Sequence, residues 1–329
     1  MSKTIGMKVF WKVLVLLVLL NGCEKEPLDN SKAPSIDETT LNISCFYTQK
    51  IEGRFEICKS ENGKHSTLTK ANGKDKWWPK HSALRNETLL YQSDNTRDVN
   101  DYASASLWML DTNHNQTLLI EQGAYGWEMQ GLCNWSHSGN EIVMAAVDTA
   151  IGRWQVYITD ANGEFPRRIT TRDDVDYFDP VFSNDDKKVY CSAIPESEPK
   201  VNSKIEIMRV DVATGIEERL TYNDHRDHHP DVSPDEKTII YESLVDPDYL
   251  SIGKWVVKEL DLSTSSEKIV IEDDNINLFP RYSSVAHLLY LTELNVETFQ
   301  MQATIYNTST DEKFNVNDTE NITMNPDPF

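Results

Sequence analysis

The densest group of side chains that could perform chemistry is the run Asp224 to His229, which reads Asp-His-Arg-Asp-His-His. Neutral imidazole nitrogens and carboxylate oxygens together can bind a divalent transition metal. The candidate ligands are His225, Asp227, His228 and His229. Because they are nearly consecutive, a complete site needs a further ligand from elsewhere in the chain. The candidates for that ligand are Asp173, Asp174, Asp176 and Asp179. The alternative is a solvated acidic loop that binds calcium or no ion.

A second group consists of aromatic and histidine residues that lie shortly before prolines or in comparable segments. Aromatic faces of this kind can stack on sugars or anchor a peptide segment. The candidate ligand-binding residues are Trp77, Trp78, Trp127, Tyr177, Phe178, His228, His229 and Phe279. The alternative is core packing for about half of them, since adjacent residues of a strand point to opposite faces.

Other catalytic patterns are missing from the sequence. It contains no Gly-Xaa-Ser-Xaa-Gly elbow, no His-Glu-Xaa-Xaa-His motif and no glycine-rich phosphate loop. The acidic pairs Asp185-Asp186 and Asp273-Asp274 are typical of turns. We therefore expect a protein without enzymatic activity and without a cofactor, while a divalent metal and an enzyme assembled from scattered loops stay open.

The N-terminus predicts a lipoprotein signal peptide over residues 1–22. Three lysines precede Val13 to Leu20, a run of eight apolar residues that is too short to span a bilayer. The segment ends in Leu-Asn-Gly-Cys, which resembles a bacterial lipobox, so Cys23 is the predicted lipidation site. The alternative is an ordinary secretory signal. Residues 23–33 are expected to be a tether, and residues 34–329 a single domain.

The net charge limits the classes of partner, and the cysteine spacing limits the classes of fold and metal site. The formal net charge of −21 opposes binding to nucleic acids and to anionic lipid headgroups. The cysteines are widely spaced, which excludes a disulfide-dense mini-scaffold and most zinc-ribbon patterns. Cys45 and Cys58 could form a disulfide in one hairpin, or remain buried thiols.

An internal repeat predicts the fold. Five times a large residue is followed by a serine, and the serines are about 50 residues apart, counted along the printed sequence. These serines are Ser82, Ser136, Ser183, Ser233 and Ser283. A proline lies two positions before the large residue in four of the copies, and a short β-prone run follows each turn. We interpret the serines as turn formers and not as nucleophiles.

Each copy continues with a strand that ends on an acidic or amide residue, and a closing strand follows it. The terminal residues of these strands are Asp111, Asp160, Asp211, Asp261 and Asn307. Their side chains can accept backbone N–H groups inside a turn. A divergent first copy begins at Pro34 and Ile36. Six four-stranded units bury their faces by radial stacking, so the sequence predicts an all-β, six-bladed β-propeller of four-stranded antiparallel blades.

Several segments resemble the repeats of TolB-type propellers. Trp135 to Gly139 and Val232 to Glu236 resemble the Trp-Ser-Pro-Asp-Gly signature, and Tyr157 to Thr170 resembles the tail of such repeats. The resemblance covers residues 33–315. It implies that segments leading into the innermost strands line one mouth of a central funnel, where ligands bind. TolB carries an α/β domain before its propeller, and only about ten tether residues precede the first repeat here, so a role in the Tol–Pal machinery does not follow. Metal-dependent oligogalacturonate lyases have propellers of a similar type.

These observations together predict a membrane-anchored lipoprotein whose funnel binds a protein segment or a glycan. We expect a monomer at the cell envelope, with the outer membrane preferred because Glu24 follows Cys23, on either the periplasmic or the surface face. The alternative functions are a metal-dependent polysaccharide lyase or hydrolase, and a structural lipoprotein without a small ligand. Residues 321–329 could close the ring against the first blade or extend freely.

Overall fold

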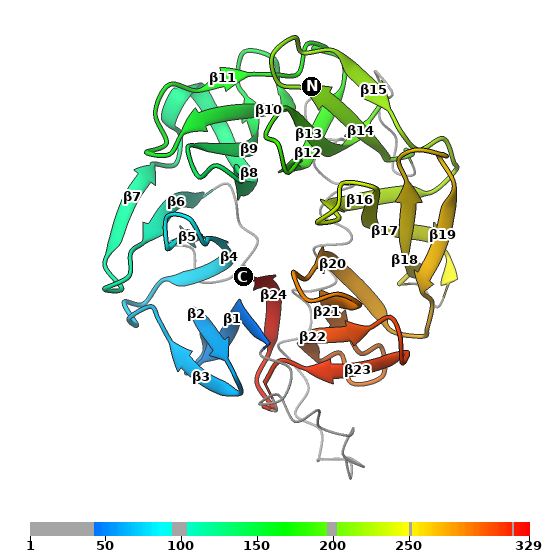
Figure 1. Ribbon diagram of the computed structural model, residues 1–329. Helices are drawn as coiled ribbons and strands as arrows, with labels where there is room; N and C mark the ends of the chain where they lie inside the picture. Colours follow the sequence, from blue (N-terminus) through cyan, green and yellow to red (C-terminus); the bar gives the residue numbers. More distant parts are fainter. Residues whose placement is uncertain (1–42, 94–103, 196–202, 250–251, 318) are drawn as a thin grey trace.

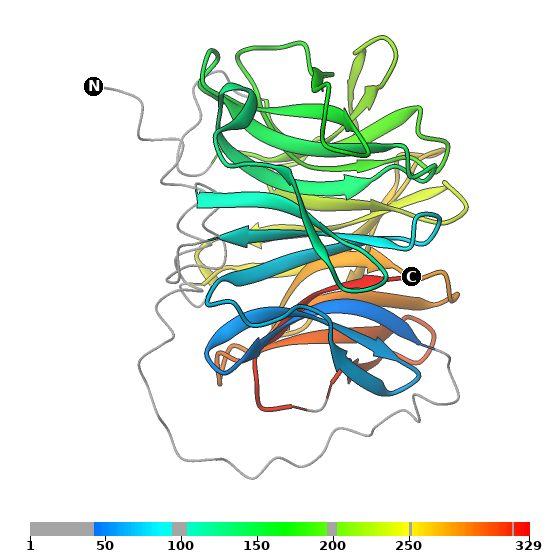
Figure 2. The ribbon, with the colours of Figure 1, turned by 90° about the vertical axis from the view of Figure 1, so that its left-hand side faces the viewer.

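The computed structural model describes residues 43–93, 104–195, 203–249, 252–317 and 319–329. Its described strands form six four-stranded antiparallel sheets, arranged as a ring around a central axis (Figure 1). The side view shows that the strands of every blade run across the thickness of this ring (Figure 2). The prediction of a six-bladed β-propeller is therefore confirmed. No helix among these residues is long and apolar enough to cross a membrane.

Five blades follow the chain, each starting at the axis and ending at the rim. Blade 2 consists of β4 (Asp75–Ser82), β5 (Glu87–Ser93), β6 (Ala105–Leu110) and β7 (Gln116–Ile120). The short 3-10 helix η2 (Ala124–Gly126) leads into blade 3, which consists of β8 (Trp127–Trp135), β9 (Glu141–Asp148), β10 (Arg153–Asp160) and β11 (Arg167–Arg168). Blade 4 consists of β12 (Asp176–Phe182), β13 (Lys188–Ile194), β14 (Glu206–Asp211) and β15 (Glu217–Arg219).

The last two of these five blades have the same strand order, from the axis to the rim. Blade 5 consists of β16 (Arg226–Val232), β17 (Thr238–Asp246), β18 (Lys254–Asp261) and β19 (Glu267–Ile271). Blade 6 consists of β20 (Ile276–Tyr282), β21 (Leu288–Leu294), β22 (Met301–Asn307) and β23 (Glu312–Asn315).

Blade 1 combines both ends of the described chain. It contains β1 (Ser44–Ile51), β2 (Arg54–Glu61) and β3 (Lys64–Thr67), and its innermost strand is β24 (Thr323–Pro328). Strand β24 pairs with β1 in antiparallel register, with Cys45 opposite Pro328 and Gln49 opposite Thr323 (Figure 1). Of the two alternatives for the C-terminal segment, ring closure is the one observed. It also covers the edge of β1, which would otherwise expose unpaired backbone groups.

The first repeat therefore differs from the prediction. We expected Pro34 and Ile36 to begin its innermost strand, but that place is taken by β24, whose Pro326 occupies the position of the repeated proline. Pro34 and Ile36 themselves lie outside the described residues, as do Cys23 and the predicted leader and tether. The C-terminal strand completes a four-stranded sheet without any segment before residue 43.

The repeated serines and acids act in turns, as predicted. Ser136 Oγ accepts the backbone N–H of Glu141 at 3.0 Å, and Ser233 Oγ accepts that of Thr238 at 3.0 Å. Asp211 Oδ1 accepts the N–H of Thr214 at 2.8 Å inside the turn between β14 and β15. These hydrogen bonds satisfy backbone donors that the strand ladders leave unpaired.

The core lies between the blades. Its largest cluster joins blades 2 and 3 and includes Trp77 and Trp127, both nearly inaccessible. No disulfide joins Cys45 and Cys58: their strands pair Cys45 with Ser60 and Cys58 with Tyr47, and Cys58 instead contacts Thr67 Oγ1 at 3.7 Å. The second alternative for these residues, buried thiols, is the one observed.

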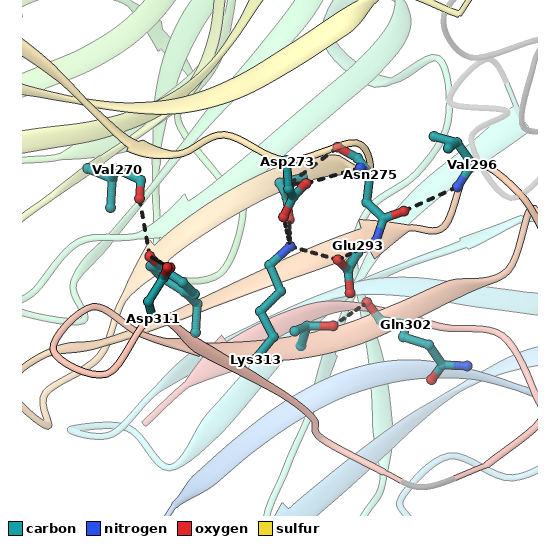
Figure 3. A network of polar contacts seen from close by, with 11 residues as sticks. Val270, Asp273, Asn275, Glu293, Val296, Gln302, Asp311 and Lys313 are labelled. Carbon is teal, nitrogen blue, oxygen red and sulfur yellow. Dashed lines mark hydrogen bonds and ion pairs between the residues drawn. The ribbon is translucent and has the colours of Figure 1, made fainter. Parts of the chain in front are cut away.

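A polar clamp secures the segment that leads into blade 6 (Figure 3). The Lys313 ammonium on β23 donates to Asp273 Oδ2 at 2.6 Å, to Asn277 Oδ1 at 2.6 Å and to Glu293 Oε1 at 2.7 Å. Asp273 Oδ1 accepts the N–H of Asn275 at 3.0 Å, which confirms the predicted turn there. The clamp thereby ties the rim of the blade to the start of its innermost strand.

Candidate functional site

Five innermost strands share a bulge at the residue that precedes proline. At this point each ladder shifts register, and the residue before the proline has a φ between 50° and 60°. These residues are Trp78, Asp179, His229, Phe279 and Asn325. Proline has no N–H and is tolerated in a sheet at such bulges. Positive φ is uncommon for residues other than glycine, and the bulge redirects the side chain.

Side chains of the neighbouring blade satisfy the N–H groups that the bulges release. Ser192 Oγ accepts the N–H of His229 at 3.2 Å, and Thr292 Oγ1 accepts the N–H of Asn325 at 2.8 Å. Glu242 Oε2 accepts the N–H of Phe279 in the same way. The second strand of one blade therefore fixes the bulge of the next.

The bulges surround a small pocket, with room for about one water molecule. It is lined by Trp78, Leu132, Asn134, Asp179, His229, Pro230, Phe279, Pro280 and Arg281. The Trp78 and Phe279 rings meet edge to face with centroids 5.3 Å apart, and the His229 and Phe279 rings do so at 4.4 Å. Five of the six blades contribute to this lining: blades 2, 4, 5 and 6 through their proline bulges, and blade 3 through Leu132 and Asn134.

A buried group, which we call the histidine cluster, lies beside the pocket and consists of Asp179, His228, His229 and Glu242. His229 Nδ1 contacts Glu242 Oε1 at 2.8 Å, and its Nε2 contacts Asp179 Oδ1 at 3.2 Å. His228 Nδ1 lies 3.5 Å from Asp179 Oδ2. The four residues come from three strands, β12, β16 and β17, of blades 4 and 5.

Burial and neighbouring charge set the protonation states of this cluster. Burial alone would lower the pKa of His229, but the carboxylates of Asp179 and Glu242 outweigh it and raise that pKa to about 10. Burial would raise the pKa of Asp179, but the facing His229 charge and the contacts with both histidines hold that pKa well below its usual range. Burial lowers the pKa of His228. At neutral pH the ion-free cluster thus holds a His229 imidazolium beside a neutral His228.

The candidate ligand-binding residues fall into three groups. Trp78, His229 and Phe279 line the pocket. Phe178 and His228 are stacked behind it, with ring centroids 5.7 Å apart. Trp77, Trp127 and Tyr177 are buried in the cores between blades. Trp77 and Trp78 both belong to the buried cluster between blades 2 and 3, and Trp78 also lines the pocket.

The candidate metal ligands are also divided. His225 Nδ1 lies 3.0 Å from Lys258 Nζ, and Asp227 Oδ1 accepts the Ser243 hydroxyl at 2.6 Å, so both belong to separate contacts within blade 5. His228 and His229 instead meet Asp179, one of the candidate fourth-blade contributors. One ligand atom from each of these three residues lies within 4.8 Å of the others. Two imidazole nitrogens and a carboxylate oxygen fit a divalent transition metal.

Several contributors escaped the sequence analysis: Glu242 of the histidine cluster, and Leu132, Asn134 and Arg281 of the pocket lining. Glu242 takes the place that the uncharged Ser192 and Thr292 have in the neighbouring blades, and this contrast was the signal. Asn325, which has the same bulge but does not line the pocket, belongs to Asn-Pro-Asp-Pro-Phe, a fifth copy of the proline motif without its serine. Its place at the end of the sequence concealed its membership of blade 1.

A second polar group, which we call the ring-closing cluster, lies two residues further along the innermost strands. It consists of Lys80, Asn134, Asp231, Arg281 and Asp327. Lys80 Nζ donates to Asp327 Oδ1 at 2.8 Å, and Arg281 Nη1 donates to Asp231 Oδ1 at 2.8 Å. Arg281 Nη2 also donates to Asn134 Oδ1, and Asn134 Nδ2 donates to the Pro180 carbonyl at 2.7 Å.

The acids of this cluster also bind backbone groups of the following blade. Asp327 Oδ2 accepts the His81 N–H at 2.7 Å, and Asp231 Oδ2 accepts the Tyr282 N–H at 2.8 Å. Blade 1 is thereby joined to blade 2, and blade 5 to blade 6.

Comparison with known proteins identifies the fold. No protein-family model matches the sequence, and no curated protein matches it. Among solved structures, TolB from Acinetobacter baumannii has a TM-score of 0.69 at 14% identity, covering 88% of this chain and 67% of that one. The chain has a TolB-like propeller fold. A protein described as TolB from Agrobacterium tumefaciens has a TM-score of 0.62 at 15% identity, covering 87% of this chain and 98% of that one.

This TolB-like fold also occurs in an enzyme. An oligogalacturonate lyase in complex with manganese has a TM-score of 0.55 at 10% identity, with 88% of this chain and 77% of that one covered. At such identities the likeness concerns the fold, and function must be argued from the site.

Proposed function

We propose that the chain is a lipid-anchored envelope protein whose axial pocket binds a segment of a partner protein or a glycan without altering it chemically. The observation that supports this best is the convergence of side chains from five blades on one pocket. A concave site with aromatic walls and a few convergent polar groups is typical of ligand binding.

The chemistry of the lining suits such a ligand. Trp78 and Phe279 offer aromatic surface, while Asn134, His229 and Arg281 offer polar groups at the same level. Aromatic anchors supply most of the binding energy in many interfaces, and polar groups fix orientation.

The anchor and location are parts of the same proposal. Cys23 carries the lipid, residues 23–33 form the tether, and the propeller lies at the envelope, with the outer membrane preferred. The acidic body, with a formal net charge of −21, favours partners other than nucleic acid. We propose a monomer.

Binding of defined probes tests this function. The full chain in detergent is applied to an immobilised oligosaccharide panel and to a displayed random-peptide library. We expect selective binding that Phe279→Ala removes. The matched control is Phe165→Ala, which changes a phenylalanine that is 78% exposed and lies outside the pocket lining. The proposal would be contradicted if the chain bound neither the oligosaccharides nor the peptides, or if both variants lost binding equally.

A metal-dependent polysaccharide lyase is the second candidate function. It is favoured by the grouping of Asp179, His228 and His229 and by the fold shared with the manganese-containing oligogalacturonate lyase. When bound, a metal would supply a Lewis acid, and Asp179, His228 and His229 would hold it. The test is incubation of polygalacturonate with the chain and Mn²⁺, followed by ultraviolet absorbance of unsaturated products. No increase over an Asp179→Asn control would exclude this activity on that substrate.

A further inference from the structure

The histidine cluster contains a buried carboxylate oxygen that no hydrogen bond satisfies. The Asp179 side chain is only 2% exposed. Its Oδ1 faces His229, whereas its Oδ2 has no hydrogen-bond partner among the described residues and lies 3.5 Å from His228 Nδ1. Leaving a buried carboxylate oxygen without a hydrogen bond is costly. His229 serves only Oδ1, so Oδ2 keeps the capacity to bind a cation.

The neighbouring groups are oriented as metal ligands require. Glu242 holds Nδ1 of His229 at 2.8 Å, which directs Nε2 of the same ring toward Asp179. Glu242 is itself fixed by the backbone N–H of Phe279. A carboxylate behind a ligating histidine sets the ring orientation and raises its basicity. The cluster thus has a supporting carboxylate as well as three ligand groups.

The donor set and its position select the class of ion. Two imidazole nitrogens and one carboxylate oxygen favour a transition metal, whereas Ca²⁺ and Mg²⁺ prefer oxygen ligands alone. Asp179 and His229 also line the pocket, so an ion bound between them would face it. Three protein ligands leave coordination positions open to a ligand in the pocket.

We infer that Asp179, His228 and His229 bind one divalent transition-metal ion beside the axial pocket, with Glu242 orienting His229. The open positions of this ion bind an anionic oxygen of whatever occupies the pocket. The ion takes the place of the proton on His229 Nε2, which is released to solvent. This inference goes beyond the proposed binding function, and it requires no lyase activity.

Metal binding by the full chain is the direct test. The protein is purified in detergent, stripped with a chelator and titrated with Co²⁺ by visible absorbance, then with Mn²⁺ and Zn²⁺ by elemental mass spectrometry. We expect one ion per chain. Asp179→Asn and His228→Gln should each lower the affinity at least 100-fold. Glu242→Gln should lower it about 10- to 100-fold, as loss of a supporting carboxylate does.

The matched control is His225→Gln. His225 lies in the same histidine-rich segment but contacts Lys258, so this variant should bind the ion as the parent does. Circular dichroism and urea unfolding verify that each variant is folded, and three independent variants keep the test decisive if one fails to fold. The inference is overturned by an ion-free parent, by full binding to Asp179→Asn, or by equal loss in His225→Gln. The readout is independent of the peptide and glycan probes, so failure of one proposal leaves the other testable.

Discussion

The two polar clusters of the innermost strands differ in how completely their carboxylates are paired. In the ring-closing cluster, Asp231 and Asp327 each bind a cation with one oxygen and a backbone N–H of the next blade with the other. In the histidine cluster, Asp179 has one oxygen without a hydrogen bond. Both clusters are buried and lie only two residues apart along the strands.

This difference separates a structural role from a binding role. A carboxylate whose two oxygens both bind protein groups has less capacity for a ligand, and its removal leaves those groups without their partner. A carboxylate with an unused oxygen beside a pocket has capacity for an added group. The completeness of hydrogen bonding is thus more informative than burial or charge, which the two clusters share.

The largest expected effect is the loss of Asp327. Replacing it with Ala leaves the Lys80 ammonium buried without its carboxylate and the His81 N–H without an acceptor. Breaking a buried pair in this way costs about 3–5 kcal/mol of unfolding free energy, measured by urea denaturation. Asp235→Ala, which removes an exposed partner of Lys237, should lower the unfolding free energy much less. Equal effects would contradict the assignment of Asp327 to ring closure.

The contribution of Lys80 to the unfolding free energy should depend on pH, which tests the structural role of the ring-closing cluster. Burial and the nearby Arg281 charge lower the pKa of Lys80 to about 8, although Asp327 partly opposes this. A depressed lysine pKa means that the unfolded chain binds more protons between pH 8 and 10.5. The unfolding free energy of the parent minus that of Lys80→Met should therefore increase across this range, by up to about 3 kcal/mol.

Urea unfolding of both proteins at pH 7.5, 9 and 10.5 measures this difference, in which the titrating groups that do not interact with Lys80 cancel. A difference that is constant or decreases with pH would show that Lys80 keeps an ordinary pKa in the folded protein.

The response to metal should distinguish the two clusters. An ion that binds the folded state alone raises the unfolding free energy by about 2.7 kcal/mol at 100 times its dissociation constant. We expect this increase for the parent and for Asp327→Asn, and its absence for Asp179→Asn. Thermal unfolding with and without Zn²⁺ measures it. An increase that survives Asp179→Asn would place the ion elsewhere.

The smallest effect is expected at His225. Its ring faces Lys258 and is partly exposed, and it takes part in neither cluster. His225→Gln should change the unfolding free energy by less than about 0.5 kcal/mol, as for most surface substitutions. A loss above about 2 kcal/mol in urea denaturation would show that the segment before β16 is more tightly coupled to the clusters than its contacts indicate.

Most of the fold could be predicted because its signals are local and repeated. Serine turns, acidic turn residues and short β-prone runs recur at a nearly constant interval, and each is fixed by contacts within one blade. The first blade was incomplete in the prediction because its innermost strand comes from residues 323–328, far from its other strands. Histidines as candidate ligands could also be predicted, since their side-chain chemistry is independent of position.

The amino-acid sequence by itself determined the six-bladed architecture, the turn chemistry and the acidic surface, because these depend on residue type and short-range spacing. Only the tertiary structure decided which candidate residues meet. Asp179 and His229 are separated by a whole blade in the chain, yet equivalent bulges on adjacent innermost strands bring their side chains to 3.2 Å. His225 and Asp227, close neighbours of His229 in sequence, point elsewhere because strand alternation and the bulge set the direction of each side chain.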